Sequence, residues 1–241
     1  GVIIEPFLDR TKMVNNAISN VEKNLMEGAL IVIFILVLFL GNFRAGLIVA
    51  SVIPLAMLFA VILMNAFGVS GNLMSLGAID FGIIVDGAVI IVEATMHHLF
   101  KLNKQKLSQK EMDSEVFKSA SKIRNSAAFG EIIILIVYLP ILALVGVEGK
   151  MFTPMAKTVG FAILGAFILS LTYVPMLSSL FLSKKTTHKE NISDKMMRFF
   201  EKIYLPILNK ALKLKVIVLS ATIALFIVAL LIYNSLGGEF M

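Results

Sequence analysis

The chain has 241 residues, of which 58% are hydrophobic and only 16% are charged, and its mean hydropathy is +0.91. A soluble domain of this size has too small an interior to bury so many apolar side chains, so the composition excludes a soluble globule, a disordered segment and a nucleic-acid-binding tail. The net charge is +6 and cysteine is absent, which excludes disulfides, thiolate metal sites and cysteine nucleophiles. The sequence therefore predicts an all-α protein of the lipid bilayer.

Six segments are long and apolar enough to cross a bilayer, whose hydrocarbon core of about 30 Å needs roughly 20 helical residues. Residues 45–79 contain no charge and are too long for one crossing. Turn-forming residues at 65–72 divide this stretch in two. The predicted spans are residues 25–43, 45–64, 73–96, 125–147, 158–182 and 216–236.

The basic residues indicate which way the spans run. If the loop 41–44 lies in the cytoplasm, the basic loops 101–124 and 184–215 lie there too. This orientation places all 22 Lys and Arg residues in the cytoplasm except Arg10, Lys12, Lys23, Lys150 and Lys157. Because positive charge favours the cytoplasmic side, we expect this orientation, with both ends of the chain on the opposite side.

Two flanking segments have apolar residues at helical spacing without being apolar enough to span. Residues 14–25 predict a helix that runs straight into the first span. Residues 197–211 combine an apolar stripe with several lysines, which favours a helix along the inner membrane surface, kinked at Pro206. A solvated linker is the alternative for this second segment.

The third span carries three carboxylates, Asp80, Asp86 and Glu93, in an otherwise apolar sequence. An ionised carboxylate in the middle of a bilayer is costly, so such residues usually face a protein interior, pair with a cation or carry a proton. On a helix Asp86 and Glu93 differ by only about 20° around the axis, and Asp80 lies about 120° from Asp86. Asp86 falls near the middle of the span and is the strongest candidate for a proton carrier. A structural role at a helix end or in packing stays open for each acid, most of all for Glu93.

Other polar residues in the spans are weaker candidates. Glu131 lies about two turns into the fourth span and is a candidate accessory polar residue that faces a crevice. His97 and His98 are adjacent and point about 100° apart on a helix, which is a poor chelate, so an interfacial role is expected. Small residues in the third span leave room for another helix: Gly77, Gly82, Gly87 and Ala88.

The third span also carries a family resemblance. The run Asp80-Phe81-Gly82-x-x-x-Asp86-Gly87-Ala88-x-x-x-Val92-Glu93 resembles the fourth-transmembrane-helix signature of heavy-metal efflux pumps of the resistance–nodulation–division (RND) superfamily, and most of all the cobalt–zinc–cadmium type. Residues 146–156 and 171–177 resemble the same family, as do the two ends of the chain. One departure is Ala94, where the family usually has Asn. The resemblance covers essentially the whole chain and implies the second to seventh helices of a twelve-helix pump, half of its transporter domain.

The resemblance implies a transporter and not an enzyme. Asp86 matches the central proton-relay aspartate, and Asp80 and Glu93 match its flanking carboxylates. Because copper and silver relatives lack the first acid, Asp80 favours divalent zinc, cobalt, cadmium or nickel over monovalent copper. The resemblance implies no resident cofactor. The metal and the protons are transported, and the metal ligands are expected in periplasmic domains outside this chain.

The resemblance also implies a domain organisation and a set of partners. Residues 1–24 would hold the end of a periplasmic domain and a lead-in helix, 25–183 five spans with a cytoplasmic loop at 100–124, 184–215 a linker helix, 216–236 the sixth span, and 237–241 the start of a second periplasmic domain. The expected place is the bacterial inner membrane. The expected partners are the bilayer, the second half of the same pump, and a homotrimer with a periplasmic adaptor and an outer-membrane channel, without nucleic acid.

Three alternatives remain at this point. A drug-exporting relative would carry two adjacent aspartates in this helix, whereas here Asp80, Asp86 and Glu93 are six and seven residues apart. An intramembrane aspartyl protease needs its two acids on facing helices, whereas Asp80 and Asp86 share one helix. The third alternative is a transporter fragment without activity.

Overall fold

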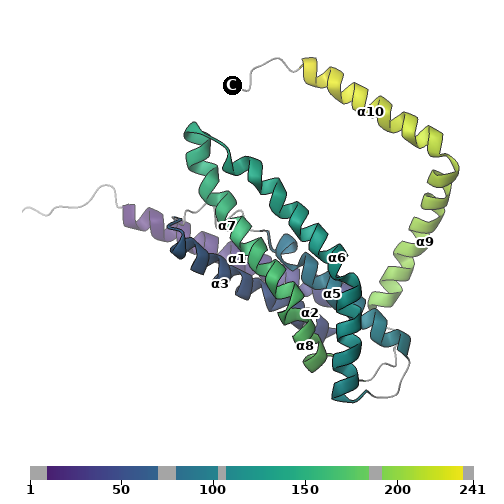
Figure 1. The fold of residues 1–241 in the computed structure, drawn as a ribbon. Helices are drawn as coiled ribbons and strands as arrows, with labels where there is room; N and C mark the ends of the chain where they lie inside the picture. The colour runs from purple at the N-terminus through teal and green to yellow at the C-terminus, as the bar shows by residue number, and fades with distance from the viewer. Residues whose placement is uncertain (1–9, 70–79, 103–106, 185–191, 236–241) are drawn as a thin grey trace, which may run out of the picture. The chain divides into compact units, whose positions relative to one another are not determined.

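The computed structural model describes residues 10–69, 80–102, 107–184 and 192–235. These residues form helices joined by short turns, and they contain no strand, so the predicted all-α fold is confirmed (Figure 1). The helices are α1 (Arg10–Leu40), α2 (Phe43–Ala50), α3 (Val52–Ala66), α5 (Phe81–Leu102), α6 (Gln109–Leu142), α7 (Gly146–Leu171), α8 (Tyr173–Phe181), α9 (Ile192–Lys213) and α10 (Lys215–Ser235). Helices α1–α8 form one compact unit, and α9 and α10 form another.

Five helical segments within the described residues are long and apolar enough to cross a membrane. They are Phe43–Ala66, Phe81–Leu102, Gln109–Leu142, Gly146–Leu171 and Lys215–Tyr233. The chain is therefore a multi-pass membrane protein, and the predicted second, fourth, fifth and sixth spans each fall on one of these segments. Part of the predicted third span, residues 73–79, lies outside the described residues.

The predicted first span differs from the structure in length. We expected it to reach residue 43, but α1 ends at Leu40 because Gly41 adopts a left-handed backbone conformation, with φ 60°. The apolar part of α1 is Met26–Leu40, which is shorter than the five other segments. Helix α1 is nevertheless continuous from Arg10, so the predicted lead-in helix that runs straight into the first apolar segment is confirmed.

Two of the predicted spans are each made of two helices. The break between α2 and α3 falls at Ser51, and the break between α7 and α8 falls at Thr172. Each break precedes a proline by three residues, Pro54 in α3 and Pro175 in α8. Proline lacks an N–H group and its ring clashes with the carbonyl four residues earlier, which weakens the helix at that turn and favours a break there. At the first break Ser51 Oγ donates a hydrogen bond of 2.7 Å to the Ile48 carbonyl. At the second break Thr172 Oγ1 donates one of 2.6 Å to the Ile168 carbonyl.

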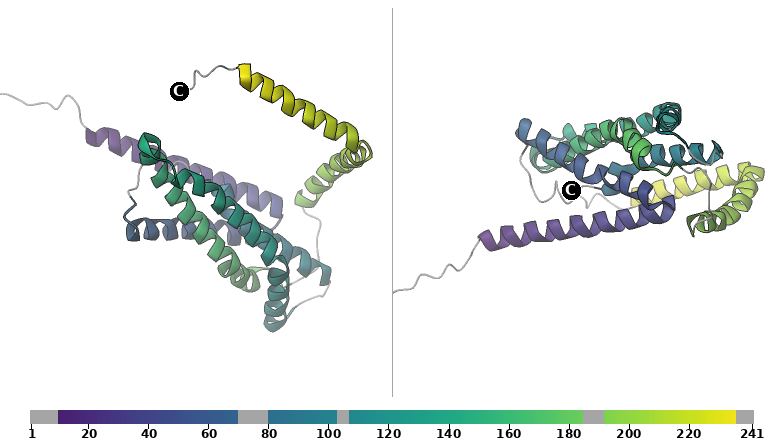
Figure 2. Two further views of the ribbon diagram at one scale, coloured as in Figure 1. Left: turned by 45° about the horizontal axis from the view of Figure 1, so that its top comes forward. Right: turned by 90° about the horizontal axis from the view of Figure 1, so that it is seen from below.

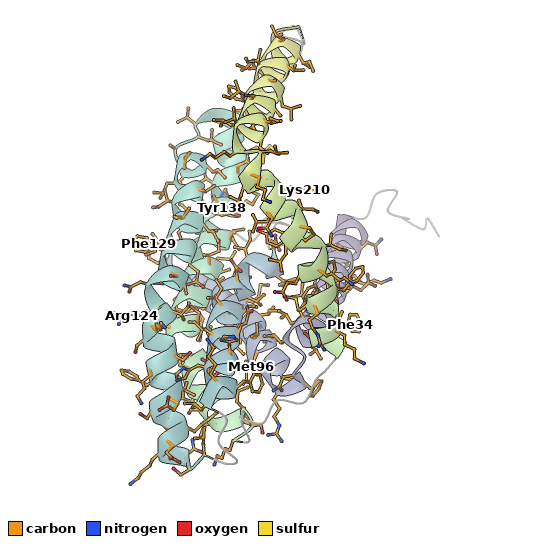
Figure 3. All side chains as sticks on the ribbon, turned by 90° about the vertical axis from the view of Figure 1, so that its right-hand side faces the viewer. Phe34, Met96, Arg124, Phe129, Tyr138 and Lys210 are labelled. Carbon is orange, nitrogen blue, oxygen red and sulfur yellow. The ribbon has the colours of Figure 1, made fainter. Side chains whose placement is uncertain are left out.

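Helix α5 is the central helix of the first unit, since it contacts α1, α2, α3, α6, α7 and α8. In the right-hand view of Figure 2, α1 lies on one side of this unit and α6 and α7 lie on the other. Large apolar side chains that point outward belong to the helices around α5, among them Phe34 on α1 and Phe129 on α6, each 68% exposed (Figure 3). This pattern suits a bundle whose outer surface meets lipid tails.

Helices α3 and α7 pack closely because small residues line their contact. A Cβ atom added to Gly165 of α7 would come within 2.6 Å of a ring carbon of Phe59 of α3, so the α7 backbone rests directly on that ring. Small buried residues accompany this contact on both helices: Ala56, Ala60, Ala162 and Ala166. In a membrane, where apolar side chains gain little by leaving lipid, such close backbone approach is a main source of helix association.

The residues just before α6 and just after α8 lie together at one end of this unit. The Leu107 N–H donates to the Lys184 carbonyl at 3.0 Å, which joins the chain before α6 to the chain after α8. Gln109 Nε2 donates to the Ser179 carbonyl at 3.1 Å. A groove at the same end is lined by Arg44 of α2 together with residues of α8. The start of α2, the start of α6 and the end of α8 therefore lie together, as alternating crossings require.

The opposite end of the unit is held by aromatic contacts. The rings of Phe67, after α3, and Phe161 of α7 lie 5.5 Å apart between centroids. The ring of Phe81, at the start of α5, packs against Gly28 of α1, where an added Cβ would be 3.3 Å from a ring carbon.

Helices α9 and α10 differ in composition. Helix α9 is amphipathic and continues past Pro206, so the segment predicted as a helix or a solvated linker is a helix. Helix α10 is apolar along its length, and its side chains from Lys215 to Tyr233 are exposed.

Candidate functional site

Helix α5 has two different faces. Exposed residues recur at intervals of four or seven and form what we call the exposed stripe: Gly82, Asp86, Glu93, His97 and Lys101. The opposite, packed face buries Ile84, Val85, Gly87, Ala88, Ile91 and Val92. Residues four and seven apart lie on one side of a helix, so the period of α5 alone separates the two faces.

Asp86 and Glu93 share the exposed stripe, as the helical period predicted. Asp86 makes no hydrogen bond or ion pair with other residues of the described ranges. Its depth in the bilayer was predicted from a span that begins at residue 73, and residues 73–79 lie outside the described part of the chain.

Asp80 stands at the start of α5 and not within the helix. It precedes the first helical residue, Phe81, and its Oδ1 accepts a hydrogen bond of 2.8 Å from the Gly82 N–H. This contact is typical of a residue that caps a helix N-terminus. The sequence had suggested that all three acids lie inside one helix, and for Asp80 the structure corrects this to the helix-end position that had been left open.

Glu131 of α6 is buried against α5 and α7. Its side chain is 3% exposed, and its Oε2 accepts a hydrogen bond of 3.3 Å from Ser170 Oγ of α7. The other carboxylate oxygen, Oε1, has no hydrogen-bond partner among the described residues. Glu131 is also close enough to Asp86 for their charges to interact. The accessory acid predicted in the fourth span therefore packs on the third span at Gly87, the residue that follows the candidate proton carrier Asp86.

Gly87 is what allows Glu131 to approach α5. A Cβ atom added to Gly87 would overlap the Glu131 carboxylate, so a larger residue here would displace that side chain. The prediction that small residues of the third span admit another helix is confirmed for Gly87 and Ala88, which are buried. Gly82 is exposed, and Gly77 lies outside the described residues.

Sequence reasoning overlooked Ser170. It is buried, 1% exposed, and its hydroxyl reaches Glu131 across 39 residues of chain. A signal was available, because Ser170 follows Ala162 and Ala166 at intervals of four in an apolar span. Such a run of small residues marks a helix contact, and a hydroxyl within it is placed to bond across that contact.

A second polar cluster lies near the basic loops, where α5 meets the first turns of α6. His98 Nε2 and Glu115 Oε2 are 2.7 Å apart, and Lys118 Nζ donates to Glu115 Oε1 at 2.8 Å. Hydrogen bonds from Lys118 and His98 hold the pKa of Glu115, which lies before the predicted fourth span, below its ordinary value. His98 therefore binds Glu115, while its neighbour His97 is exposed.

No group of three or more His, Asp and Glu side chains comes close enough to hold a metal ion among the described residues. The polar chemistry of this part of the molecule is thus the carboxyl chemistry of Asp86 and Glu131, with the exposed Glu93 and the capping Asp80 on the same helix as Asp86.

Comparison with known proteins agrees with this arrangement of helices. The model of the AcrB/AcrD/AcrF family matches residues 1–241. The cobalt-zinc-cadmium resistance protein CzcA of Cupriavidus metallidurans is 48% identical over 244 residues, which cover 100% of this chain and 23% of CzcA. The cation efflux system protein CusA of Escherichia coli K12 is 29% identical, again over 100% of this chain and 23% of the relative.

A solved structure shows the same fold. The crystal structure of a heavy metal efflux pump superposes with a TM-score of 0.61 and 43% sequence identity, covering 71% of this chain and 16% of that chain. The present chain thus spans about a quarter of the length of the relatives it matches.

Proposed function

Since the chain belongs to the AcrB/AcrD/AcrF family of RND efflux proteins, we propose that it forms membrane helices of a proton-driven exporter of heavy-metal cations. The observation that supports this most is Asp86, a carboxyl on the central helix that no cation of the described residues neutralises. A carboxyl placed in this way is suited to bind and release protons. The relatives named for metal resistance and cation efflux supply the cargo class.

Asp86 is the central proton-binding residue of the proposal, and Asp80 and Glu93 are its flanking acids. Moving one elementary charge through 100 mV releases about 2.3 kcal/mol, which is the work that a proton can supply to metal export. To use it, Asp86 must take a proton from one side of the membrane and release it to the other, with a change in helix packing between. Helix α5 contacts every other helix of its unit, so a change at Asp86 acts on all of them.

We further propose that the cargo is divalent: zinc, cobalt, cadmium or nickel. The chain is 48% identical to CzcA and 43% identical to the nickel and cobalt resistance protein CnrA, but 29% identical to CusA. Asp80 supports the same choice through the resemblance described above. The protein would carry no resident cofactor, and its metal ligands would lie in regions that this chain does not include.

The proposal extends to place and partners. The protein would lie in the bacterial inner membrane, with the basic loop end facing the cytoplasm. A second half of the same pump would cover the exposed stripe of α5, and a homotrimer with a periplasmic adaptor and an outer-membrane channel would complete the export path. Export of drugs is the second candidate function. The third possibility is a transporter fragment without activity.

Reconstitution of the full-length pump tests the function. In proteoliposomes with an imposed proton gradient, zinc, cobalt or cadmium should move only while the gradient lasts, and metal movement should collapse the gradient faster. In a metal-sensitive host the same pump should restore growth on these cations. Rescue limited to copper or silver would reject the divalent cargo, and metal movement that ignores the gradient would reject the proton drive.

Cysteine labelling tests the orientation, because these 241 residues contain no native cysteine that would react with the reagent. Ser114 and Val147 are both exposed, and they lie in the predicted cytoplasmic and outer loops respectively. An impermeant thiol reagent on intact cells should label Val147→Cys and should reach Ser114→Cys only after the membrane is opened. Labelling of Ser114→Cys in intact cells would reverse the orientation.

A further inference from the structure

We propose that Glu131 is the buried partner of Asp86 in a two-carboxyl site that binds one proton, with Ser170 as the residue that links this site to α7. This inference rests on the proposed proton-driven export and adds to it a second proton-binding residue on a different helix. It follows from four features of the structure: the burial of Glu131, its unpaired oxygen, its contact with Gly87, and the competing acceptors of Ser170.

The first two features concern the cost of charge. Glu131 is 3% exposed, and one of its two oxygens has no hydrogen-bond partner among the described residues. A buried ionised carboxylate needs a cation or several donors, and without them it costs far more than a neutral carboxylic acid. Among the described residues Glu131 accepts one hydrogen bond, from the hydroxyl of Ser170. Its surroundings therefore favour the form that holds a proton.

The charged and titratable groups on the helices around Glu131 do not change this conclusion. On α5, Asp86 interacts with it by like charge, and Glu93 lies two turns further on at the surface. On α6 the exposed Arg124 lies seven residues earlier, about 10 Å along the axis. The other charged groups on α6, α7 and α8, such as the exposed Lys157, lie about two turns or more from Glu131 or Ser170. The remaining titratable groups on these helices are two half-buried tyrosines, Tyr138 and Tyr173.

The third feature is the juxtaposition of the two acids. The Glu131 carboxylate lies on the backbone of Gly87, the residue next to Asp86, in space that a Cβ atom would fill. A negative charge on Asp86 opposes a second negative charge on Glu131, so the pair favours a state that holds one proton. Asp86 is exposed and can exchange protons with water, whereas Glu131 is enclosed. The pair thus has an accessible member and a protected member.

The fourth feature connects the pair to α7. The Ser170 hydroxyl has one hydrogen and two acceptors, Glu131 Oε2 at 3.3 Å and the Phe167 carbonyl at 2.9 Å. An ionised Glu131 is the stronger acceptor and draws the hydroxyl toward α6, and a protonated Glu131 releases it to the carbonyl of its own helix. Binding of the proton is therefore felt by α7, the helix that packs most closely on α3 through Gly165.

Carboxyl labelling of the full-length pump tests the protonated state directly. Dicyclohexylcarbodiimide reacts with protonated carboxyls in apolar surroundings. Trypsin releases residues 125–150, in which the carboxyls are Glu131 and Glu148, and fragmentation distinguishes the two. Glu131 should be modified near neutral pH, and Asp86→Asn should move the pH at which labelling is half-maximal downward, because it removes the neighbouring negative charge. An unmodified Glu131, or an unchanged pH profile in Asp86→Asn, would overturn the proposal.

Transport by matched variants separates a proton-binding role from a packing role. Glu131→Gln keeps the size and the Ser170 contact but not the acid, and we expect metal-driven proton flux to fall by about a hundredfold. Glu131→Asp should restore much of the flux with a changed pH profile, and Glu201→Gln on the exposed face of α9 should leave it unchanged. Full flux in Glu131→Gln would count against the inference.

The two proposals can fail separately. If the wild-type pump moves metal without protons, the proposed function fails, and the labelling experiment still reports whether Glu131 holds a proton beside Asp86. If the wild-type pump couples protons to metal while Glu131→Gln does so equally well, the proposed function stands and the partner role of Glu131 is rejected.

Discussion

The exposed stripe and the packed face of α5 belong to one helix but depend on different physical quantities. The packed face buries Ile84, Val85 and Ile91 against neighbouring helices, so its residues are constrained by volume. The exposed stripe carries Asp86 and Glu93, which make no hydrogen bond or ion pair within the described residues, so its residues are constrained by charge. Gly87 joins the two, because it lets a carboxyl from α6 reach the stripe from the packed side. Changes on the stripe should therefore alter transport without unfolding the protein. Changes on the packed face should instead lower the stability of the fold.

Asp86→Asn should have the largest effect on transport and little effect on folding. The amide is close in size to the acid but cannot bind and release a proton near neutral pH, so metal resistance should be abolished while expression and assembly stay normal. Metal-driven proton flux in proteoliposomes, with size-exclusion profiles as the folding control, measures both. Undiminished proton-coupled export by this variant would remove Asp86 from the proton pathway.

Gly87→Ala should lower stability because its methyl group overlaps the Glu131 carboxylate. Overpacking of this kind typically costs about 1–3 kcal/mol, so the thermal midpoint of the purified pump should fall. Gly130→Ala on α6 is the matched control, since an added Cβ there meets no atom within 4 Å. Replacing Gly by Ala in an open helical position stabilises by about 1 kcal/mol, so the control should not lose stability. Equal midpoints for the two variants would show that Gly87 is not a packing constraint.

Asp80 allows charge and capping to be separated. Asp80→Asn keeps a side-chain oxygen for the Gly82 N–H and removes the negative charge, whereas Asp80→Ala removes both. The alanine variant should lose about 1 kcal/mol of helix stability, and the asparagine variant should lose little. If Asp80 also serves export, both variants should reduce zinc transport, though less than Asp86→Asn does. Normal transport by Asp80→Asn would leave a capping role alone.

Glu93→Gln should have a milder effect on transport than the changes at Asp86 and Asp80. Glu93 is exposed and lies two turns from Asp86 toward the end of α5. Initial rates of zinc export in the same vesicles measure the difference. A loss as complete as that of Asp86→Asn would instead give the two acids equal weight in the proton pathway.

Glu115→Gln should produce the smallest change, and this change should depend on pH. Hydrogen bonds from Lys118 and His98 lower the pKa of Glu115. These bonds to the ionised Glu115 therefore stabilise the fold above its ordinary pKa of 4.5, and the contribution is lost as the pH falls through the lowered pKa. Because Lys118 is exposed, the loss should stay below about 1 kcal/mol. The difference in thermal midpoint between wild type and variant should be present at pH 7 and should vanish in acid. A difference that persists in acid would contradict the ion-pair explanation.

Helices with the same mean hydropathy show how far composition can predict structure. The segments Phe43–Ala66 and Lys215–Tyr233 are equally apolar, yet the first buries one face in the unit and the second is exposed throughout. Hydropathy is a sum over residues and therefore identifies a span from the sequence alone. Packing depends on which small residues meet a neighbour, as at Gly165 and Phe59, and a sum does not record it.

The sequence by itself determined the features that depend on neighbouring residues. The apolar runs identified the spans, and the helical period placed Asp86 and Glu93 on one face. Pro54 and Pro175 stand inside two of the predicted spans, but the sequence did not say that each would divide its span into two helices.

Only the tertiary structure decided which residues meet across helices. Glu131 and Ser170 are 39 residues apart, and the rotation of each helix about its axis, which sets the contact, follows from the packing of every side chain along it. The pairing of His98 with Glu115, and the meeting of Glu131 with Gly87 beside Asp86, arise in the same way. Local periodicity predicts which face of a helix a residue occupies. Which helix packs on that face depends on how well whole helices fit together.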